Sequence, residues 1–564
     1  MSPIPVLKDR RSGVLLQLTS LPGPHGSGDL GPAAPRFAEF LAAAGQGWWQ
    51  MLPAGPSGYG NCPYMAASAF AGNPEWISLE RLREDRLLGR GDLGIELPRA
   101  NGKVRFEEMR RFREPRLRKA ASEFFRQGRH EDLARFEAFG FDHAAWLPDY
   151  ALWCALKTRH GAISWTEWPA ELRGRDPQAL ARARQELADE VRLHQFYQYE
   201  FARQWSELRD RCRVLGIGLI GDVPIYVAHE SADVWAHPEL FHLDDAGRPA
   251  LVAGVPPDYF SPTGQRWGHP LYRWDRLREN GYAWWVARLG RVLGMFDAVR
   301  LDHFIGFHRY WEIPASCPTA VEGRWAEGPG TDLFDALQRE LGSIPIIAED
   351  LGVVTPGVIA LRDRYGFPGM RVLQFAFGGN PSLNDHLPHR YPFSCVVYTG
   401  THDNDTTLGW YRALCMRGEA GDAEAVRERA FLRRYLGGEP TAIHWDLARL
   451  AIHSTADLAI IPAQDLLGIG PEGRMNLPST PTGNWEWRME ESALDDRIGI
   501  RLRDLTETYG RVPPSTAAAG TMAGTTATGA MGATAAATAT MGMATATAAA
   551  ASARARATTP TRGK

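Results

Sequence analysis

The chain has 564 residues, enough for one large domain with insertions or for two or three domains. Its 63 basic and 66 acidic side chains give a net charge of −3, and 44% of its residues are hydrophobic. This balance is typical of a globular protein and excludes a strongly basic nucleic-acid-binding or membrane-surface protein.

The six cysteines are scattered, with no CxxC or zinc-ligand spacing, which is typical of reduced thiols in the cytoplasm. The first residues, MSPIPVLKDRR, lack the apolar stretch of a signal peptide, and no apolar run reaches the roughly 18 residues of a membrane span. We therefore expect a cytoplasmic protein outside the membrane, and nothing in the chain requires a cofactor or a metal ion.

Eight short apolar runs alternate with segments of helical spacing along the chain. The predicted strands are Gly13–Leu18, Gly47–Leu52, Leu215–Asp222, Phe296–Asp302, Ile344–Glu349, Met370–Phe375, Ser394–Tyr398 and Leu458–Pro462. Helices are predicted at Pro35–Ala44, Pro148–Thr158, Pro177–Arg211, Tyr282–Gly294, Thr331–Leu341, Pro356–Tyr365 and Ala423–Leu436. Eight buried strands alternating with helices predict an α/β fold, a (β/α)8 TIM barrel.

The composition also divides the chain into four parts. Residues 1–78 contain the first two strands, and the charged, helix-forming residues 79–211 predict a helical insertion between strands two and three. Residues 212–512 complete the barrel, with loop insertions at its C-terminal face and no separate C-terminal β-sandwich. Residues 513–564 are rich in Ala, Thr, Gly and Met, and cannot bury enough apolar surface to order, so we expect a disordered tail.

The fourth predicted strand runs into the cluster Arg300, Asp302 and His303. Arg300 and Asp302 are two residues apart, so in an extended chain they point to the same face. A guanidinium beside a carboxylate keeps that carboxylate ionised and oriented, as a nucleophile requires. A structural ion pair fits the same pattern.

Carboxylates follow five of the eight predicted strands, and in a barrel the C-terminal strand ends form the active site. They are Asp222, Asp302, Glu349 with Asp350, Asp403 with Asp405, and Asp465. Such a group indicates either a hard-cation site or glycoside chemistry. Aromatic and amide side chains in the loops favour glycosides. Asp302 and Glu349 come from adjacent strands about 4.8 Å apart, closer to the carboxyl spacing of retaining than of inverting glycosidases.

Six segments follow one another in the order of a known family: Gly221–Trp235, Pro256–Tyr272, Val299–Pro314, Ile346–Gly352, Tyr398–Trp410 and Arg474–Arg488. Through them, residues 12–512 resemble the 4-α-glucanotransferases, the amylomaltase or disproportionating enzyme family of the α-amylase-like group. The chain departs from the family pattern at Asn61 and Cys62, where we expect Asp and Ser.

The resemblance implies a role for each of three carboxylates. Asp302 is the nucleophile that forms a covalent β-glucosyl intermediate, and Glu349 is the acid and then the base. Asp403 holds the distorted sugar. The other side chains implied in sugar binding, some in the aromatic lid Pro256–Tyr272, are Arg300, Asp222, His402, Tyr59, Tyr64, Asp258, Tyr259, Phe260, Gln265, Trp267, Asn404 and Asn476. Of the tryptophans, we expect Trp267 and Trp485 to face sugar.

The implied activity is that of a retaining 4-α-glucanotransferase. It would move α-1,4-glucan segments by double displacement, with maltooligosaccharides, amylose, glycogen-like polymers and glucose as its partners. An aromatic lid that excludes water favours transfer over hydrolysis. An α-1,4-glucan hydrolase and a non-catalytic glucan-binding protein are the alternatives.

Overall fold

The computed structural model describes residues 6–94, 97, 102–257 and 261–512. The chain divides into two units, Met1–Val512 and Pro513–Lys564. The second unit, and with it the predicted disordered tail, lies outside the described residues. The fold below is that of the first unit.

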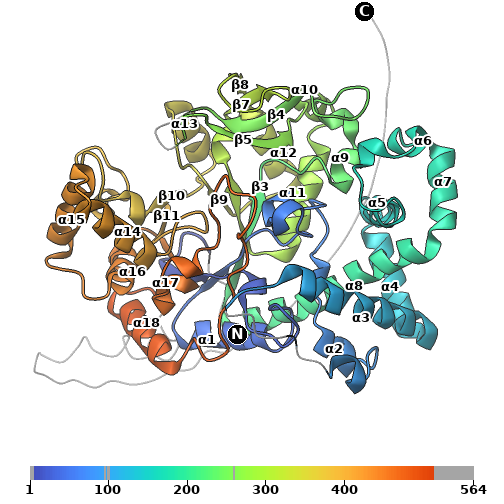
Figure 1. The fold of residues 1–564 in the computed structure, drawn as a ribbon, viewed down its shortest axis with the longest axis horizontal. Helices are drawn as coiled ribbons and strands as arrows, with labels where there is room; N and C mark the ends of the chain where they lie inside the picture. The colour runs from blue at the N-terminus through green and yellow to red at the C-terminus, as the bar shows by residue number, and fades with distance from the viewer. Residues whose placement is uncertain (1–5, 95–96, 98–101, 258–260, 513–564) are drawn as a thin grey trace, which may run out of the picture. The chain divides into compact units, whose positions relative to one another are not determined.

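Eight parallel strands close into a barrel in the order β1-β12-β11-β10-β9-β6-β3-β2 (Figure 1). The strands are β1 Arg11–Leu15, β2 Trp48–Gln50, β3 Gly218–Pro224, β6 Ala298–Asp302, β9 Ile346–Ala348, β10 Gly369–Val372, β11 Cys395–Tyr398 and β12 Leu458–Pro462. Each overlaps one of the eight predicted strands, because strands buried on both faces are continuous apolar runs. The predicted (β/α)8 barrel is confirmed.

Helices surround the barrel and form the insertion. Those outside the insertion are α1 Ala33–Ala43, α9 Ala232–Ala236, α10 Trp274–Glu279, α11 Ala283–Met295, α12 Gly330–Leu341, α13 Pro356–Arg364, α14 Thr407–Glu419, α15 Ala423–Leu436, α16 Ile443–His453, α17 Ala463–Leu467 and α18 Asp496–Thr508. In Figure 1 the insertion helices lie on one side of the barrel and α14, α15 and α16 on the other.

The helical insertion lies between β2 and β3, as predicted. Its described helices are α2 Leu79–Glu84, α3 Phe106–Gln127, α4 His130–Asp142, α5 Leu147–Arg159, α6 Ala170–Arg173, α7 Pro177–Glu186 and α8 Ala188–Leu215. The single helix predicted over 177–211 is wrong, because Leu187 leaves helical geometry and packs against the core. Helix α8 continues to Leu215, so the expected insertion boundary at residue 211 falls inside a helix, and the division at residues 78 and 211 stays a prediction.

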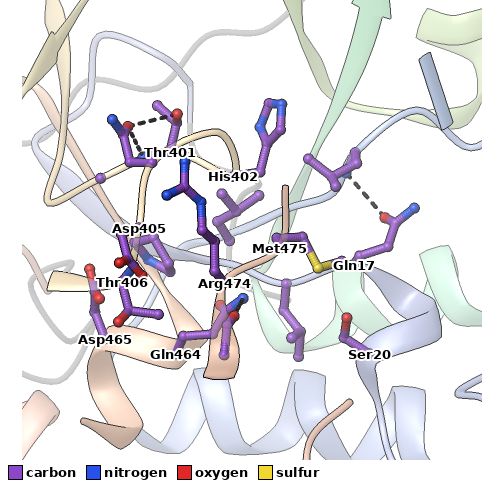
Figure 2. A pocket seen from close by; sticks show the side chains of 17 residues that line it. Gln17, Ser20, Thr401, His402, Asp405, Thr406, Gln464, Asp465, Arg474 and Met475 are labelled. Carbon is purple, nitrogen blue, oxygen red and sulfur yellow. Dashed lines mark hydrogen bonds between the residues drawn. The ribbon is translucent and has the colours of Figure 1, made fainter. Parts of the chain in front are cut away.

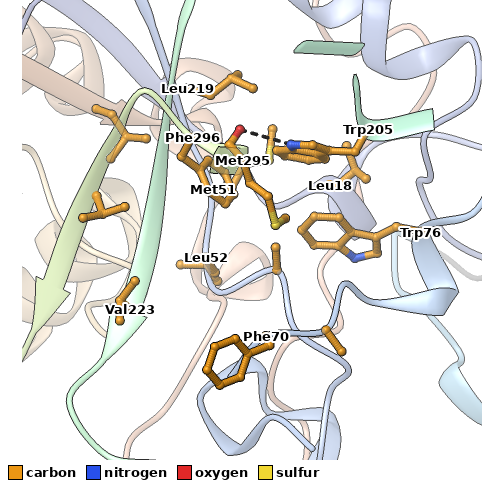
Figure 3. Packing of buried hydrophobic residues seen from close by; sticks show 14 of the residues in the cluster. Leu18, Met51, Leu52, Phe70, Trp76, Trp205, Leu219, Val223, Met295 and Phe296 are labelled. Carbon is orange, nitrogen blue, oxygen red and sulfur yellow. Dashed lines mark hydrogen bonds between the residues drawn. The ribbon is translucent and has the colours of Figure 1, made fainter. Parts of the chain in front are cut away.

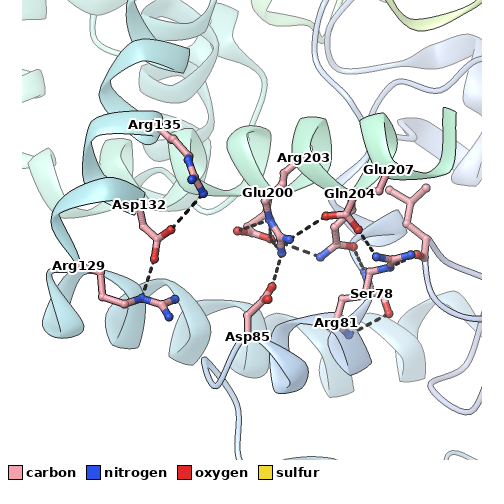
Figure 4. Close-up of polar contacts among 11 residues, drawn as sticks. Ser78, Arg81, Asp85, Arg129, Asp132, Arg135, Glu200, Arg203, Gln204 and Glu207 are labelled. Carbon is pink, nitrogen blue, oxygen red and sulfur yellow. Dashed lines mark hydrogen bonds and ion pairs between the residues drawn. The ribbon is translucent and has the colours of Figure 1, made fainter. Parts of the chain in front are cut away.

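Helix α8 holds the loop that follows β2. The side chain of Gln198 accepts a hydrogen bond from the N–H of Gly72 at 2.8 Å and donates one to its carbonyl at 2.9 Å. One turn and a half later, Gln204 accepts from the N–H of Ser78 at 2.7 Å. Figure 4 shows Arg203, between them, facing Asp85 on the segment after α2. The insertion therefore fixes a loop that carries candidate site residues.

A second sheet, which the sequence analysis missed, lies beside the barrel. Its four antiparallel strands follow the order β5-β4-β7-β8, with β4 Leu251–Val255, β5 Gln265–Pro270, β7 Arg309–Pro314 and β8 Arg324–Glu327. The expected lid Pro256–Tyr272 is therefore partly a strand. These strands escaped prediction because they are not continuous apolar runs: β5, β7 and β8 carry charged and polar residues, and glycine interrupts β4.

Large apolar side chains fill the space between the barrel wall and the insertion. Figure 3 shows Met51, Trp76, Leu219 and Phe296 packed around Met295, whose carbonyl accepts a hydrogen bond from the indole N–H of Trp205 at 3.1 Å. All six cysteines are free thiols. Within the described ranges, no helix combines the length and the apolar character needed to cross a bilayer.

Gly72 tests how tightly the loop and α8 pack. A Cβ on Gly72 would lie 2.1 Å from the ring of Phe201, so we expect Gly72→Ala to destabilise the fold by about 1–3 kcal/mol through overpacking. Thermal unfolding measures the change. The control is Gly140→Ala in α4, where a Cβ meets nothing within 4 Å. Equal unfolding temperatures for the two variants would contradict the close packing.

Candidate active site

An ion-paired arginine lies at the C-terminal ends of β3 and β6. The strand register places Asp222 opposite Arg300. Nη1 of Arg300 donates to both oxygens of Asp222, at 2.7 and 2.9 Å, and Nη2 lies 2.8 Å from Oδ1 of Asp302. Burial lowers the pKa of Arg300, but the two carboxylates outweigh it and raise that pKa well above its usual value. The guanidinium thus carries a fixed positive charge between two acids.

Glu349 lies next to this group, directly after β9, the neighbour of β6 in the barrel. Its carboxyl accepts hydrogen bonds from the backbone N–H of His303 at 2.7 Å and of Leu351 at 3.1 Å. Burial raises the pKa of Glu349 from about 4.5 to about 8, and the charge of Asp302 adds to the shift while Arg300 opposes it. Glu349 therefore keeps its proton at neutral pH.

An aromatic stack borders the acids on a second side. The hydroxyl of Tyr64 donates to Oδ2 of Asp222 at 2.7 Å, and its ring stacks on His402 with centroids 5.1 Å apart. Trp485 packs on both rings, at 5.8 and 5.9 Å. Trp485 is 6% exposed and supports two side chains of the site. Whether it also faces sugar stays a prediction.

Asp403 follows β11 and faces the same region. Oδ1 of Asp403 accepts a hydrogen bond from Nδ2 of Asn476 at 2.7 Å and lies 3.4 Å from Nε2 of His402. A pocket adjoins His402 at the ends of β1, β11 and β12 (Figure 2). Its polar lining includes Gln17, Ser20, Thr401, Gln464 and Arg474.

Strand β5 brings part of the expected lid to the site. The indole N–H of Trp267 donates to Oε1 of Gln265 at 3.1 Å. The ring of Trp267 also meets His303 edge to face, at 4.8 Å, next to Glu349. Three other expected lid residues, Asp258, Tyr259 and Phe260, lie outside the described residues.

Two expected sugar contacts are not part of this cluster. Tyr59 is 77% exposed. Asn404 uses its Oδ1 within its own turn, where it accepts from the N–H and the hydroxyl of Thr401 at 2.8 and 2.9 Å. Whether either residue binds sugar stays a prediction.

Two of the strand-end carboxylates serve the fold. Asp465 is buried and accepts from the N–H and the hydroxyl of Thr407, both at 2.7 Å. Asp350 accepts from the N–H of Met370 at 2.7 Å and pairs with Arg362. Sequence position alone does not separate such carboxylates from those that face the site. Among the described residues, no group of three His, Cys, Asp or Glu side chains has the arrangement of a metal site.

The closed parallel barrel, with a protonated and an ion-paired carboxyl at neighbouring strand ends, places the protein in the class of (β/α)8-barrel enzymes. The family model described as 4-alpha-glucanotransferase matches residues 16–494. The chain belongs to the 4-alpha-glucanotransferase family and is an enzyme of that family.

Curated relatives match along nearly the whole first unit. The 4-alpha-glucanotransferase of Thermus thermophilus is 50% identical over 512 residues, which cover 89% of this chain and 99% of that relative. The enzyme of Synechocystis sp. is 46% identical, covering 90% and 99%. The chloroplastic/amyloplastic enzyme of Solanum tuberosum is 43% identical, covering 89% and 87%.

Solved structures show the same fold. The amylomaltase from Streptococcus agalactiae in complex with acarbose superposes with a TM-score of 0.85 at 35% identity, covering 89% of this chain and all (100%) of that one. The amylomaltase from Corynebacterium glutamicum reaches a TM-score of 0.71 at 21% identity, covering 88% and 75%, and supports the fold alone.

The raised pKa of Glu349 can be tested through the pH dependence of the free energy of unfolding. Between pH 5 and 8 the folded protein holds a proton on Glu349 that the unfolded chain releases, so rising pH weakens folding. Glu349→Gln cannot titrate. We expect its stability relative to the wild type to rise by at least about 1.4 kcal/mol, the equivalent of one pKa unit, from pH 5 to pH 8. Denaturant unfolding at both pH values measures this.

The control for that comparison is Glu327→Gln, which changes an exposed carboxyl on β8. Its difference from the wild type should be the same at both pH values. A pH-independent difference for Glu349→Gln as well would contradict the raised pKa.

Proposed function

We propose that the enzyme transfers segments of α-1,4-glucans from a donor to an acceptor glucan or to glucose, with retention of configuration. The observation that carries the proposal is the pair of unlike carboxyls at adjacent strand ends. Asp302 is ion-paired with Arg300, whereas the pKa of Glu349 is raised to about 8 by burial. One ionised and one protonated carboxyl are what a retaining double displacement needs.

In the first step Asp302 attacks the anomeric carbon of the donor. The bond from that carbon to the glycosidic oxygen breaks, and Glu349 gives its proton to the leaving oxygen. This leaves a glucosyl ester on Asp302 and an ionised Glu349. The positive charge of Arg300, 2.8 Å from Oδ1 of Asp302, orients the nucleophile.

In the second step a sugar hydroxyl takes the place of the leaving group. Glu349 accepts the proton of that hydroxyl, its oxygen bonds to the anomeric carbon, and the ester bond to Asp302 breaks. Both carboxyls return to their starting states. If water took this place, the same site would hydrolyse glucans, so exclusion of water decides between transfer and the alternative of an α-glucan hydrolase.

The surrounding side chains suit a hydroxylated ring. Asp222, His402 and Asp403 offer charged and polar groups around the acids, and Tyr64 adds an aromatic wall. Trp267 on β5, hydrogen-bonded to Gln265, packs on His303, whose backbone N–H donates to Glu349. The related amylomaltase from Streptococcus agalactiae is described in complex with acarbose, which supports a saccharide ligand for this site.

We also propose that the enzyme works in the cytoplasm. The support is its six free cysteines, since disulfides are rare where thiols are kept reduced.

The product profile from maltotriose tests the proposed function. Purified protein with maltotriose alone should give glucose and a ladder of longer maltodextrins with a constant number of reducing ends, because each transfer breaks one bond and makes one. Chromatography with a reducing-sugar assay measures both. Asp302→Ala should lose at least about a thousandfold in rate. Shorter products with more reducing ends would instead establish a hydrolase.

The pH dependence of transfer tests the role of Glu349. The acid must be protonated in the free enzyme, so kcat/KM should fall about tenfold per pH unit above about pH 8. Initial rates between pH 6 and 10 measure this fall in kcat/KM, and circular dichroism verifies that the protein stays folded. A flat profile to pH 10 in folded enzyme would contradict the assignment of Glu349 as the acid.

A further inference from the structure

Arg474 joins two loops beside the candidate active site. One is the turn after β11 that carries Asp403, and the other is the loop after α17 that carries Asn476. Nη2 of Arg474 donates to the backbone carbonyl of Asp403 and Nε donates to that of Asn476, both at 2.8 Å. In Figure 2 its side chain lies among Thr401, Asp405 and Met475 in the pocket next to His402. The guanidinium therefore bridges the main chains of the two loops.

Asn476 adds two further hydrogen bonds between the same loops. The side-chain amide of Asn476 donates to Oδ1 of Asp403 at 2.7 Å, and its backbone N–H donates to the carbonyl of His402 at 3.1 Å. Together with the bond from Nη2 of Arg474 to the carbonyl of Asp403, three hydrogen bonds link residues 402–403 to residues 474–476. The carboxylate of Asp403 thus depends on the placement of Asn476.

A planar guanidinium suits this bridge better than a lysine would. Its N–H groups are held in a rigid fork, so one side chain can serve two carbonyls at a fixed separation, whereas an ammonium is a flexible point donor. Within the described part of the chain, no carboxylate oxygen forms a salt bridge with Arg474 within 4.0 Å. Its two side-chain hydrogen bonds in the same part of the chain go to the backbone carbonyls of Asp403 and Asn476. Such contacts fix the position of the main chain.

A later residue of the same loop, Trp485, is held in a costly conformation. Trp485 has a φ of 66°, which is a strained backbone region for a bulky residue. Its N–H donates to the carbonyl of Met475 at 2.7 Å, and its ring packs on His402. A strained conformation persists only where the surrounding contacts hold it. Here Trp485 contacts Met475, which precedes Asn476, and His402, which precedes Asp403.

We propose that Arg474 is a positioning residue, which fixes the carboxylate of Asp403 through Asn476 for its contact with the reacting sugar. The inference rests on the proposed function and on the role that the family resemblance implies for Asp403, which is to hold the distorted ring. Because this contact strengthens towards the transition state, its loss lowers kcat more than it raises KM.

The test compares Arg474→Lys with a matched control, Arg10→Lys. Arg10 also bridges two segments through backbone carbonyls, those of Ser454 at 2.8 Å and Tyr509 at 3.2 Å, but it precedes β1 and so lies at the other end of the barrel. We expect Arg474→Lys to lower kcat for maltotriose about tenfold with a KM change below about threefold. Arg10→Lys should lower the unfolding temperature and leave kcat unchanged. Equal kcat values for the two variants would overturn the proposal.

A double-mutant cycle separates positioning from general loosening. Asn476→Ala removes the link to Asp403, so it should lower kcat by itself, and adding Arg474→Lys should then cost less than about twofold. The unfolding temperature should still fall in both backgrounds. Fully additive losses in kcat would overturn the proposal, even if Arg474→Lys folds poorly alone. A wild type that makes no maltodextrin ladder would instead refute the proposed function.

Discussion

The site depends on one buried ion group, Arg300 between Asp222 and Asp302. Three charges in a protein interior lose much hydration, and the loss is offset only when each charge has partners in good geometry. Here the register of β3 and β6 places Asp222 beside Arg300, and Asp302 follows two residues later on the same strand. Removing Arg300 would leave the buried carboxyl of Asp222 without its ionic partner. The closed barrel supplies the rigidity that holds the three in place.

Glu349 is buried beside this ion group but, among the described residues, forms no ion pair of its own. It lies one strand further round the barrel, where backbone N–H groups contact its oxygens but burial dominates, so its pKa rises to about 8. Of the two carboxyls on neighbouring strands, Asp302 thus has a direct ion pair with Arg300, whereas burial raises the pKa of Glu349. A buried acid with a raised pKa weakens folding near neutral pH, and this is a common cost of an active site.

The parts that could be predicted from sequence are those with a strong local signal. The eight barrel strands are apolar runs, and the positions of Asp302 and Glu349 at strand ends follow from them. The sheet of β4, β5, β7 and β8 could not be predicted, because its short strands lack a clear alternation. Asp465 shows a second limit, since the direction of a side chain depends on tertiary packing. Arg474 gave no signal, because its partners are backbone carbonyls, and the one it reaches in the other loop, that of Asp403, is distant in sequence.

The loops of the site share one mode of support, which explains how irregular segments can hold precise geometry. The loop after β2 is held by Gln198 on Gly72, the turn after β11 by Asp465 on Thr407, and the loop after α17 by Arg474. In each case a side chain satisfies main-chain groups that no strand or helix pairs. Gln198 and Asp465 come from helices elsewhere in the fold, whereas Arg474 belongs to the loop itself and also reaches the carbonyl of Asp403. Loops fixed in this way are ordered before substrate arrives, so binding need not offset the entropy of ordering them.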